Sequence, residues 1–253
     1  MKFRTLFKLI QVIIFFVFPF FLDKTGYAQL PEGLERCKSG NSLILLLIDE
    51  SSSTKESAEI YRNSAQQIVN SLTQCDHLTA IAIREDSISK AVPIVNIEIP
   101  KPKSISNTIK EKRYKTAYED YLRTTKTESI KKINDDMKKS AKKTDIFSAL
   151  KYAGDFFKQF SNFQSKRLII LSDMIHATNP YNFKTNLPSV MDVEAHLKKN
   201  NLEPDLSNVD VYIVTGISDV SGKAYGNIQG FWKDFLKKYH AVEKGYSNTL
   251  LNY

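Results

Sequence analysis

Hydrophobic residues along the chain form two kinds of pattern. Ser42–Ile48 is a continuous apolar run, as expected of a strand that is buried on both faces of a sheet. Between Ala58 and Leu72 the apolar residues recur at helical spacing instead, which predicts an amphipathic helix. Other runs rich in Ile, Val and Leu predict further strands at 78–84, 91–99, 167–172 and 209–215.

Helical spacing also predicts three helices in the second half of the chain. They are a helix that Thr144 opens and that reaches Phe160, one around Val190–Lys199 and one at Gly230–His240. Strands that alternate with helices indicate an α/β fold with a doubly wound, mostly parallel sheet and helices on both faces. The short polar link between the strands at 78–84 and 91–99 favours one antiparallel edge strand. A typical strand order for such a sheet is 3-2-1-4-5.

Positive charge is concentrated in one segment. The formal net charge is +8, and residues 101–143 alone hold fourteen Lys or Arg against six Asp or Glu. Residues 1–28 add +3, so the remainder is slightly acidic. Tyr and Ile residues within 101–143 fall at helical spacing and could form one packing face. We expect this segment to be a basic helical insertion that lies outside the central sheet, is partly separable, and contributes little to the core.

The N-terminus has the pattern of a secretory signal peptide. A short basic stretch, Met1–Lys8, precedes an apolar run at Leu9–Leu22, and Gly26-Tyr27-Ala28 offers small residues at a cleavage site. We therefore expect residues 1–28 to be removed and residues 29–253 to form a domain that is periplasmic or secreted. An N-terminal membrane anchor is the alternative, although the fourteen residues of the run span only about 21 Å of a hydrocarbon core about 30 Å thick.

The two cysteines gain a meaning from export. An oxidising compartment permits a disulfide between Cys37 and Cys75. Both precede strands that are expected to be parallel neighbours, so they fall at one edge of the sheet, opposite to the ligand-binding edge. Two buried free thiols are the alternative, and two cysteines are too few for a four-Cys zinc site.

Two carboxylates follow strands that meet where the expected strand order reverses. In open α/β sheets, ligands bind beyond the carboxyl ends of the strands at this reversal. It lies between the strands at 42–48 and 167–172, which Asp49 and Asp173 follow directly. The sequence therefore predicts that both carboxylates lie at the ligand-binding edge.

Hydroxyl residues complete a recognisable arrangement around these carboxylates. The motifs are Asp49-x-Ser51-x-Ser53 after an apolar strand, Thr144-Asp145-Ile146-x-x-Ala149-Leu150 at the start of a helix, and Ser172-Asp173 at the end of a later strand. In this order and setting they resemble the von Willebrand factor A domain, and the resemblance extends roughly from Ser42 to Tyr239. It implies that Asp49, Ser51, Ser53, Thr144 and Asp173 form a metal-ion-dependent adhesion site.

The resemblance implies Mg²⁺ as the cofactor, with Mn²⁺ or Ca²⁺ as alternatives, because hydroxyl and carboxylate oxygens are hard ligands. It also implies a cation that keeps part of its positive charge and an open position for an acidic side chain of a partner protein. Three features depart from the family's pattern. Met174 stands where Gly is frequent, Glu50 adds an acidic side chain inside the motif, and the basic segment is long.

Each of these residues also has a purely structural explanation. Ser53-Thr54-Lys55-Glu56 is a capping box, which would make Ser53 an N-cap, and Thr144 is an equally good N-cap. Asp49 and Asp173 could simply solvate the ends of their strands. His176 could line the cleft, but we expect it to be a solvated loop residue.

Enzyme classes find little support in the sequence. It contains no Gly-x-Ser-x-Gly, Walker, Gly-x-Gly-x-x-Gly or His-Glu-x-x-His motif. We expect an exported protein-binding module that depends on a divalent cation, and not an enzyme. The alternatives are a metal-free interaction or scaffold module on the same fold and, after that, an exported hydrolase. The basic segment could contact an anionic surface, whereas export argues against nucleic acid as a partner.

Overall fold

The computed structural model describes residues 30–85, 91–160, 162–217 and 220–250. The expected signal peptide, residues 1–28, lies outside these ranges. Glu32–Tyr253 belong to one compact unit. Within the described ranges, no helix has both the length and the apolar composition that a bilayer crossing requires.

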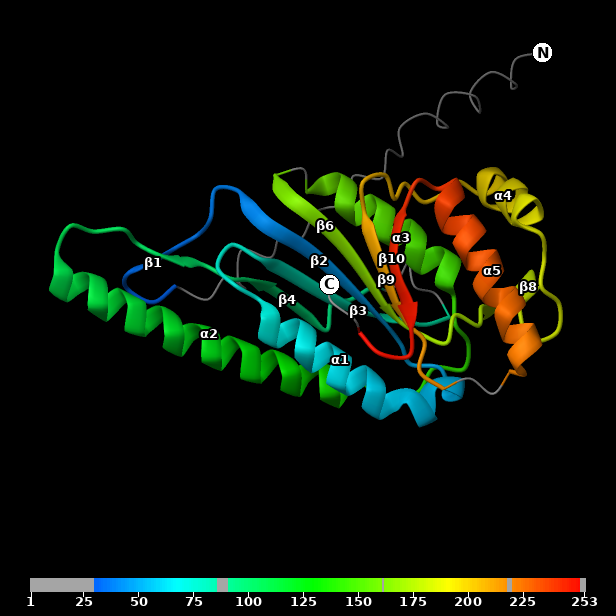
Figure 1. The fold of residues 1–253 in the computed structure, drawn as a ribbon, viewed down its shortest axis with the longest axis horizontal. Helices are drawn as coiled ribbons and strands as arrows, with labels where there is room; N and C mark the ends of the chain where they lie inside the picture. Colours follow the sequence, from blue (N-terminus) through cyan, green and yellow to red (C-terminus); the bar gives the residue numbers. More distant parts are fainter. Residues whose placement is uncertain (1–29, 86–90, 161, 218–219, 251–253) are drawn as a thin grey trace, which may run out of the picture. The chain divides into compact units, whose positions relative to one another are not determined.

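A six-stranded sheet with the order β10-β9-β6-β2-β3-β4 runs through the described part of the chain (Figure 1). Its strands are β2 (Gly40–Asp49), β3 (His77–Ile83), β4 (Val95–Glu98), β6 (Phe163–Leu171), β9 (Asp210–Val214) and β10 (Val242–Ser247). β3 and β4 pair antiparallel, and the other neighbours are parallel. The strand order therefore reverses between β2 and β6, as expected, with one antiparallel strand at an edge.

Alternate residues of β2 enter two separate hydrophobic clusters, one on each face of the sheet. The first cluster takes Leu43, Leu45 and Leu47, and the second takes Ile44, Leu46 and Ile48. A strand that is buried on both faces has no position for a polar side chain, which explains the unbroken apolar run. The doubly wound α/β fold class is thereby confirmed.

Helices cover both faces of this sheet (Figure 1). They are the 3₁₀ helix η1 (Ser52–Ser57), α1 (Ala58–Ser71), α2 (Thr108–Asp136), α3 (Ile146–Gln159), α4 (Val190–Lys199) and α5 (Gly222–Lys238). Apolar side chains of α1 and α2 join the cluster that contains Ile44, and those of α3, α4 and α5 join the cluster that contains Leu43. The chain thus changes face between β2 and β6, which leaves the carboxyl ends of these two strands as the natural site for a ligand.

The basic segment contains one long helix, α2, which lies outside the six-stranded sheet and packs against the core. α2 is capped by Asn107, whose side chain accepts hydrogen bonds from the backbone N–H groups of Ile109 and Lys110, both at 3.1 Å. Its C-terminal half buries Ile133 in the same cluster as α1. Lys126 Nζ also donates to the backbone carbonyl of Asn70 in α1 at 2.7 Å. The expectation that this segment contributes little to the core is therefore wrong for this half of α2.

The N-terminal half of α2 lies along a small two-stranded sheet (Figure 1). In this sheet β1 (Leu34–Glu35) pairs antiparallel with β5 (Lys101–Pro102). Gly33, directly before β1, has a φ of 90°, and the ring of Tyr114 packs where a Cβ atom would otherwise stand. Glycine is required at this position both for its conformation and for the close approach of the ring.

Cys37 and Cys75 form a disulfide, with Cα atoms 5.5 Å apart. They precede β2 and β3, so the bridge lies at the amino ends of these strands, opposite to Asp49. The two cysteines are 38 residues apart in the sequence. In the chain-entropy model, closing a loop of this size raises the free energy of the unfolded state by about 4 kcal/mol.

Differences from the sequence-based expectations include β4, α5 and β10. β4 is shorter than 91–99, because Pro93 cannot donate a ladder hydrogen bond. α5 begins at Gly222 rather than Gly230. Glycine occurs at every fourth position of its first two turns, and its low helix propensity argues against a helix there. β10 was not expected, because its first three residues are exposed and its sequence has no apolar alternation, as is common for an edge strand.

We predict that Ile133→Ala lowers the free energy of unfolding by about 2–4 kcal/mol, because the side chain is 1% exposed in the cluster shared with α1. Ile109→Ala is the matched control on the same helix, since Ile109 is 83% exposed, and should change stability by less than about 0.5 kcal/mol. Guanidinium unfolding followed by circular dichroism measures both. Equal effects of the two substitutions would show that α2 is a separable projection after all.

Candidate metal centre

Two carboxylates lie at the carboxyl edge of the sheet, where the strand order reverses. Asp49 ends β2, and Asp173 follows β6 after one residue. β2 and β6 are hydrogen-bonded neighbours, with Ile48 opposite Leu171. Asp49 is 3% exposed and Asp173 is fully buried. The explanation that these side chains only solvate strand ends is therefore wrong.

Asp49 accepts hydrogen bonds on both carboxylate oxygens. Its Oδ1 accepts from the backbone N–H of Ser51 at 2.8 Å and from the Thr144 hydroxyl at 3.4 Å. Its Oδ2 accepts from the Ser172 hydroxyl at 2.6 Å. Burial nevertheless raises the pKa of Asp49 above its ordinary value, although the hydrogen bonds oppose this shift. The surrounding groups fix this carboxylate without fully compensating its charge.

Ser51 directly precedes η1 and Ser53 lies on it, and neither residue caps an α-helix. Ser51 precedes this 3₁₀ helix, and neither it nor Ser57, which precedes α1, forms a side-chain cap hydrogen bond. The expected capping box at Ser53 is therefore wrong. The hydroxyls of Ser51 and Ser53 instead lie 2.9 Å apart. Thr54 secures the turn, since its hydroxyl lies 3.1 Å from the carbonyl oxygen of Asp49 and 2.9 Å from that of Ser51.

Thr144 is likewise not the N-cap that the sequence suggested. Asp145 caps α3, and its side chain accepts from the backbone N–H of Ser148 at 3.1 Å. The Thr144 hydroxyl, which is buried, turns toward Asp49 instead. The backbone carbonyl of Thr144 accepts from the N–H of Ala177 at 2.9 Å, which holds the residue against the loop that follows β6.

Asp173 carries the clearest sign of a missing charge. Its Oδ1 accepts from the backbone N–H of Ile175 at 3.0 Å, whereas its buried Oδ2 has no hydrogen-bond partner within the described ranges. Burial, followed by the nearby Asp49 carboxylate, raises the pKa of Asp173 to about 6. Ser53 partly opposes this shift, although its hydroxyl is engaged with Ser51. An unpartnered buried carboxylate oxygen is costly unless a cation neutralises it.

His176 is buried, which contradicts the expectation of a solvated loop residue. Its Nδ1 accepts from the backbone N–H of Ile146 at 3.2 Å, and its Nε2 lies 2.9 Å from the Thr178 hydroxyl. Burial lowers the pKa of His176 to about 3, so the ring is neutral. It joins the loop after β6 to the start of α3, and so it positions Asp173 and Thr144 relative to each other.

Met174 takes a backbone conformation that favours glycine. Its φ is 61°, in the left-handed region that glycine adopts without steric cost. Its carbonyl accepts a hydrogen bond from the Trp232 indole of α5 at 2.8 Å, and its N–H donates to the Ser172 hydroxyl at 2.9 Å. These bonds, together with a fully buried side chain, hold the strained turn after Asp173 in place.

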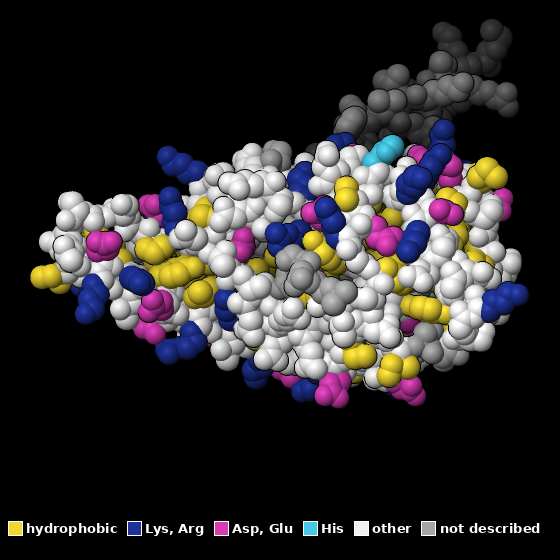
Figure 2. Space-filling view, in the orientation of Figure 1, with side chains coloured by type: hydrophobic (Ala, Val, Ile, Leu, Met, Phe, Trp, Pro, Cys, Tyr) yellow, Lys and Arg dark blue, Asp and Glu magenta, His cyan; other side chains and the backbone are white. Residues whose placement is uncertain are grey.

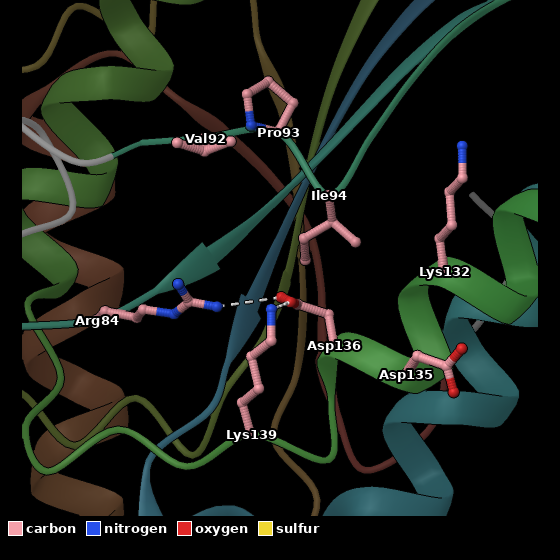
Figure 3. A pocket seen from close by; sticks show the side chains of 8 residues that line it. All are labelled: Arg84, Val92, Pro93, Ile94, Lys132, Asp135, Asp136 and Lys139. Atoms are coloured by element: carbon pink, nitrogen blue, oxygen red, sulfur yellow. Dashed lines mark hydrogen bonds and ion pairs between the residues drawn. The ribbon is translucent and has the colours of Figure 1, made fainter.

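Glu50 connects the same loop to α2. Its Oε2 accepts from Arg84 Nε at 2.9 Å, and Arg84 Nη2 reaches Asp136 Oδ2 at 3.2 Å. Burial raises the pKa of Glu50 to about 7. Figure 3 shows Arg84 and Lys139 converging on Asp136 in a groove of about 480 Å³. Because basic and acidic side chains both line this groove, it does not select for a ligand of one charge.

The donor set fits a hard divalent cation. The described residues contain no cluster of three or more His, Cys, Asp or Glu side chains that could hold a metal. Any cation here would therefore depend on three hydroxyls (Ser51, Ser53 and Thr144) beside two carboxylates (Asp49 and Asp173). Ser51 contacts Ser53 and Thr144 contacts Asp49. Asp173 lies close enough to Asp49 and Ser53 for both to act on its pKa, and its Oδ2 has a lone pair that no described residue uses. Such oxygen donors suit Mg²⁺ or Mn²⁺.

The positioning roles of several residues were not identified from the sequence. Ser172, Thr54 and the ion network of Glu50, Arg84 and Asp136 all act on the site residues. Ser172 belongs to the motif at the end of its strand, but the sequence does not show that its hydroxyl donates to Asp49. The ion network joins residues 50, 84 and 136 across three elements, and no sequence spacing reports such a contact.

We predict that Asp173→Asn raises the stability of the metal-free protein at neutral pH by up to about 2 kcal/mol, because it removes a buried charge that faces a second carboxylate. Thermal unfolding in chelator measures the effect. Asp234→Asn, on the exposed side of α5, is the control and should change stability by less than about 0.5 kcal/mol. A clear loss of stability in Asp173→Asn would mean that Oδ2 has a partner the account lacks.

Comparison with known proteins gives only distant likenesses. No protein-family model and no curated protein matches the chain. Similar solved structures include the ArnB paralog VWA2 from Sulfolobus acidocaldarius (16% identity, TM-score 0.44), the PilB minor pilin from Streptococcus sanguinis (13%, 0.47) and a von Willebrand factor type A protein from Catenulispora acidiphila (13%, 0.40). They match 87%, 84% and 79% of this chain, which in turn covers 44%, 58% and 42% of theirs, or about half their length. These TM-scores lie below 0.5, so the similarities do not by themselves establish the fold. The fold class rests on the order and direction of the chain's own strands.

Proposed function

We propose that the chain is an exported protein-interaction module that depends on a divalent cation. The observation that carries this proposal is Asp173 Oδ2, a buried carboxylate oxygen without a partner among the described residues, beside the second buried carboxylate of Asp49. Ser51, Ser53 and Thr144 add hydroxyl oxygens at the same edge of the sheet. A cation there would offset the charge that the protein groups leave uncompensated.

The chain's own residues would act as a rigid holder. Ser172 and the Ser51 N–H orient Asp49, while His176 and the Ala177 N–H hold the Thr144 and Asp173 loops together. When bound, the cation supplies positive charge and a coordination position for a carboxylate of a partner protein. The pre-formed loops would lower the ordering entropy that binding must overcome.

Export is supported by two independent features of the sequence and the structure. The N-terminal basic, apolar and small-residue pattern is that of a signal peptide. The disulfide between Cys37 and Cys75 suits an oxidising compartment. On the face of the molecule drawn in Figure 2, Lys and Arg side chains are scattered among Asp and Glu. We therefore regard contact of the basic segment with an anionic surface as a lesser part of the proposed function than the metal site.

A metal-free scaffold is the second candidate. Both oxygens of Asp49 already accept hydrogen bonds without a cation, and this observation favours it. The hydrolase interpretation is disfavoured by the state of His176. Both ring nitrogens of this residue already have hydrogen-bond partners, and burial lowers its pKa to about 3. It therefore cannot act as a general base near neutral pH.

We predict that Mg²⁺ or Mn²⁺ binds with modest affinity and raises the melting temperature, because only two carboxylates supply charge. At a concentration of 100 times Kd the gain should be about 2.7 kcal/mol. Thr144→Val removes the hydroxyl with little change of shape and should weaken the cation at least about tenfold, whereas Thr127→Ala on the exposed face of α2 should not. Calorimetry that detects no binding to the wild type at millimolar metal would favour the scaffold.

We also predict that partner proteins bind only when the cation is present. A pull-down from cell-envelope extract is run once with Mg²⁺ and once with chelator, with the Thr144→Val variant alongside the wild type. Proteins captured by the wild type in Mg²⁺ should be lost in chelator and lost with the variant. Capture that ignores both changes would identify a metal-free interaction.

A further inference from the structure

Four lysines surround the point where the insertion returns to the candidate metal site. They are Lys138, Lys139, Lys142 and Lys143, here called the lysine rim. The backbone N–H of Ala141, at the centre of this run, donates to the carbonyl of Glu50 at 2.8 Å. Ala141 also forms a parallel β-bridge with Ser51. The loop that contains the rim is thus paired directly with the Asp49–Ser53 loop and leads into Thr144.

Unlike the rest of the basic segment, the lysine rim is held at a fixed position beside the candidate metal site. Lys142 lies two residues before Thr144, so their Cα atoms are within about 7 Å of each other. The other lysines of α2 are distributed along a helix that extends away from the site, since 29 helical residues span about 43 Å. Charge on the rim therefore acts on whatever binds at the metal edge.

Among the described residues, one lysine of the rim has no counter-charge. Lys138 pairs with Asp135 at 2.7 Å, Lys143 pairs with Glu85 at 2.9 Å, and Lys139 pairs with Asp136. Lys142 is exposed and forms no ion pair with any described residue. The exposed pairs are individually weak, but they leave Lys142 as the group most ready to meet an incoming anion.

The nearby acidic side chains do not cancel this charge. Glu50 is buried and paired with Arg84, and Asp49 and Asp173 are buried beneath the edge. With a cation over these two carboxylates, the accessible surface beside Thr144 would be positive. A partner with a single carboxylate would bind the cation and leave the positive charge of Lys142 without a counter-ion. A second carboxylate of the partner would form an ion pair with Lys142.

We infer that the site recognises an acidic cluster rather than a single acidic residue, with one carboxylate on the cation and a second on Lys142. This inference rests on the proposed function and narrows its partner class. The charge of Lys142 has opposite effects on the two binding partners, because it attracts the acidic protein but repels the cation. Neutralising Lys142 should therefore weaken the partner while leaving the cation's affinity unchanged or slightly higher.

The test compares two synthetic peptides of equal length in Gly-Ser background, one with a single Asp and one with three successive Asp residues. Binding of each is measured by fluorescence anisotropy in Mn²⁺, and Mn²⁺ binding itself is measured by electron paramagnetic resonance. For the wild type, the triple-Asp peptide should bind more tightly than the single-Asp peptide. Lys142→Gln should lower this advantage about threefold, as expected for one exposed charge pair at contact distance, without weakening Mn²⁺.

Lys110→Gln is the matched control, because it makes the same charge change at the far end of α2. It should leave both the peptide preference and Mn²⁺ binding unchanged. An equal loss of preference in both variants would assign the effect to net charge and overturn the inference, as would an unchanged preference in Lys142→Gln. Failure of the wild type to bind Mn²⁺ would overturn the proposed function itself. Mn²⁺ binding without binding of either peptide would overturn only the acidic-cluster inference.

Discussion

Two carboxylates buried side by side at the carboxyl edge of a parallel sheet impose the main electrostatic constraint on this protein. Removing an ionised carboxylate from water costs several kcal/mol even after relaxation, and here Asp49 and Asp173 also repel each other. Asp49 is stabilised by the Ser51 N–H and by two hydroxyls. Asp173 receives one backbone N–H and retains an unpartnered oxygen within the described ranges. The unequal treatment of the pair indicates where a positive charge is needed.

The loops around the site are arranged to keep this pair in place. η1 replaces an ordinary helix start and so turns the Ser51 and Ser53 hydroxyls toward each other. Asp145 caps α3 and leaves Thr144 available, while the neutral ring of His176 holds the α3 start against the loop after β6. Met174 accepts a left-handed conformation to complete the turn. Each local irregularity thus serves the geometry of one edge of the sheet.

The fold followed from sequence because its signals are periodic and local. The apolar run of β2 and the helical spacing of α1 and α3 reflect burial that each element undergoes by itself. The strand order followed from the general behaviour of parallel sheets, and from it the positions of Asp49, Asp173 and the disulfide. β10 escaped prediction because an edge strand buries little, and so its sequence has no apolar alternation.

The fine structure of the site did not follow, because it depends on competition between groups distant in sequence. Ser53 and Thr144 satisfy every local rule for an N-cap, yet the structure uses neither for this purpose. The burial of His176 depends on α3, and the pairing of Glu50 with Arg84 depends on the end of β3. Likewise, the packing of Ile133 against α1 makes a segment that looks solvated part of the core.

A crystal structure of the protein grown with millimolar Mn²⁺, with anomalous diffraction measured at the manganese edge, would test the central claim most directly. The account predicts one anomalous peak at the carboxyl edge of β2 and β6, in contact with hydroxyl oxygens of Ser51, Ser53 and Thr144 and adjacent to the Asp49 and Asp173 carboxylates. An edge without a peak, with Asp173 Oδ2 hydrogen-bonded to ordered water instead, would contradict it. A peak bound only by other residues would do the same.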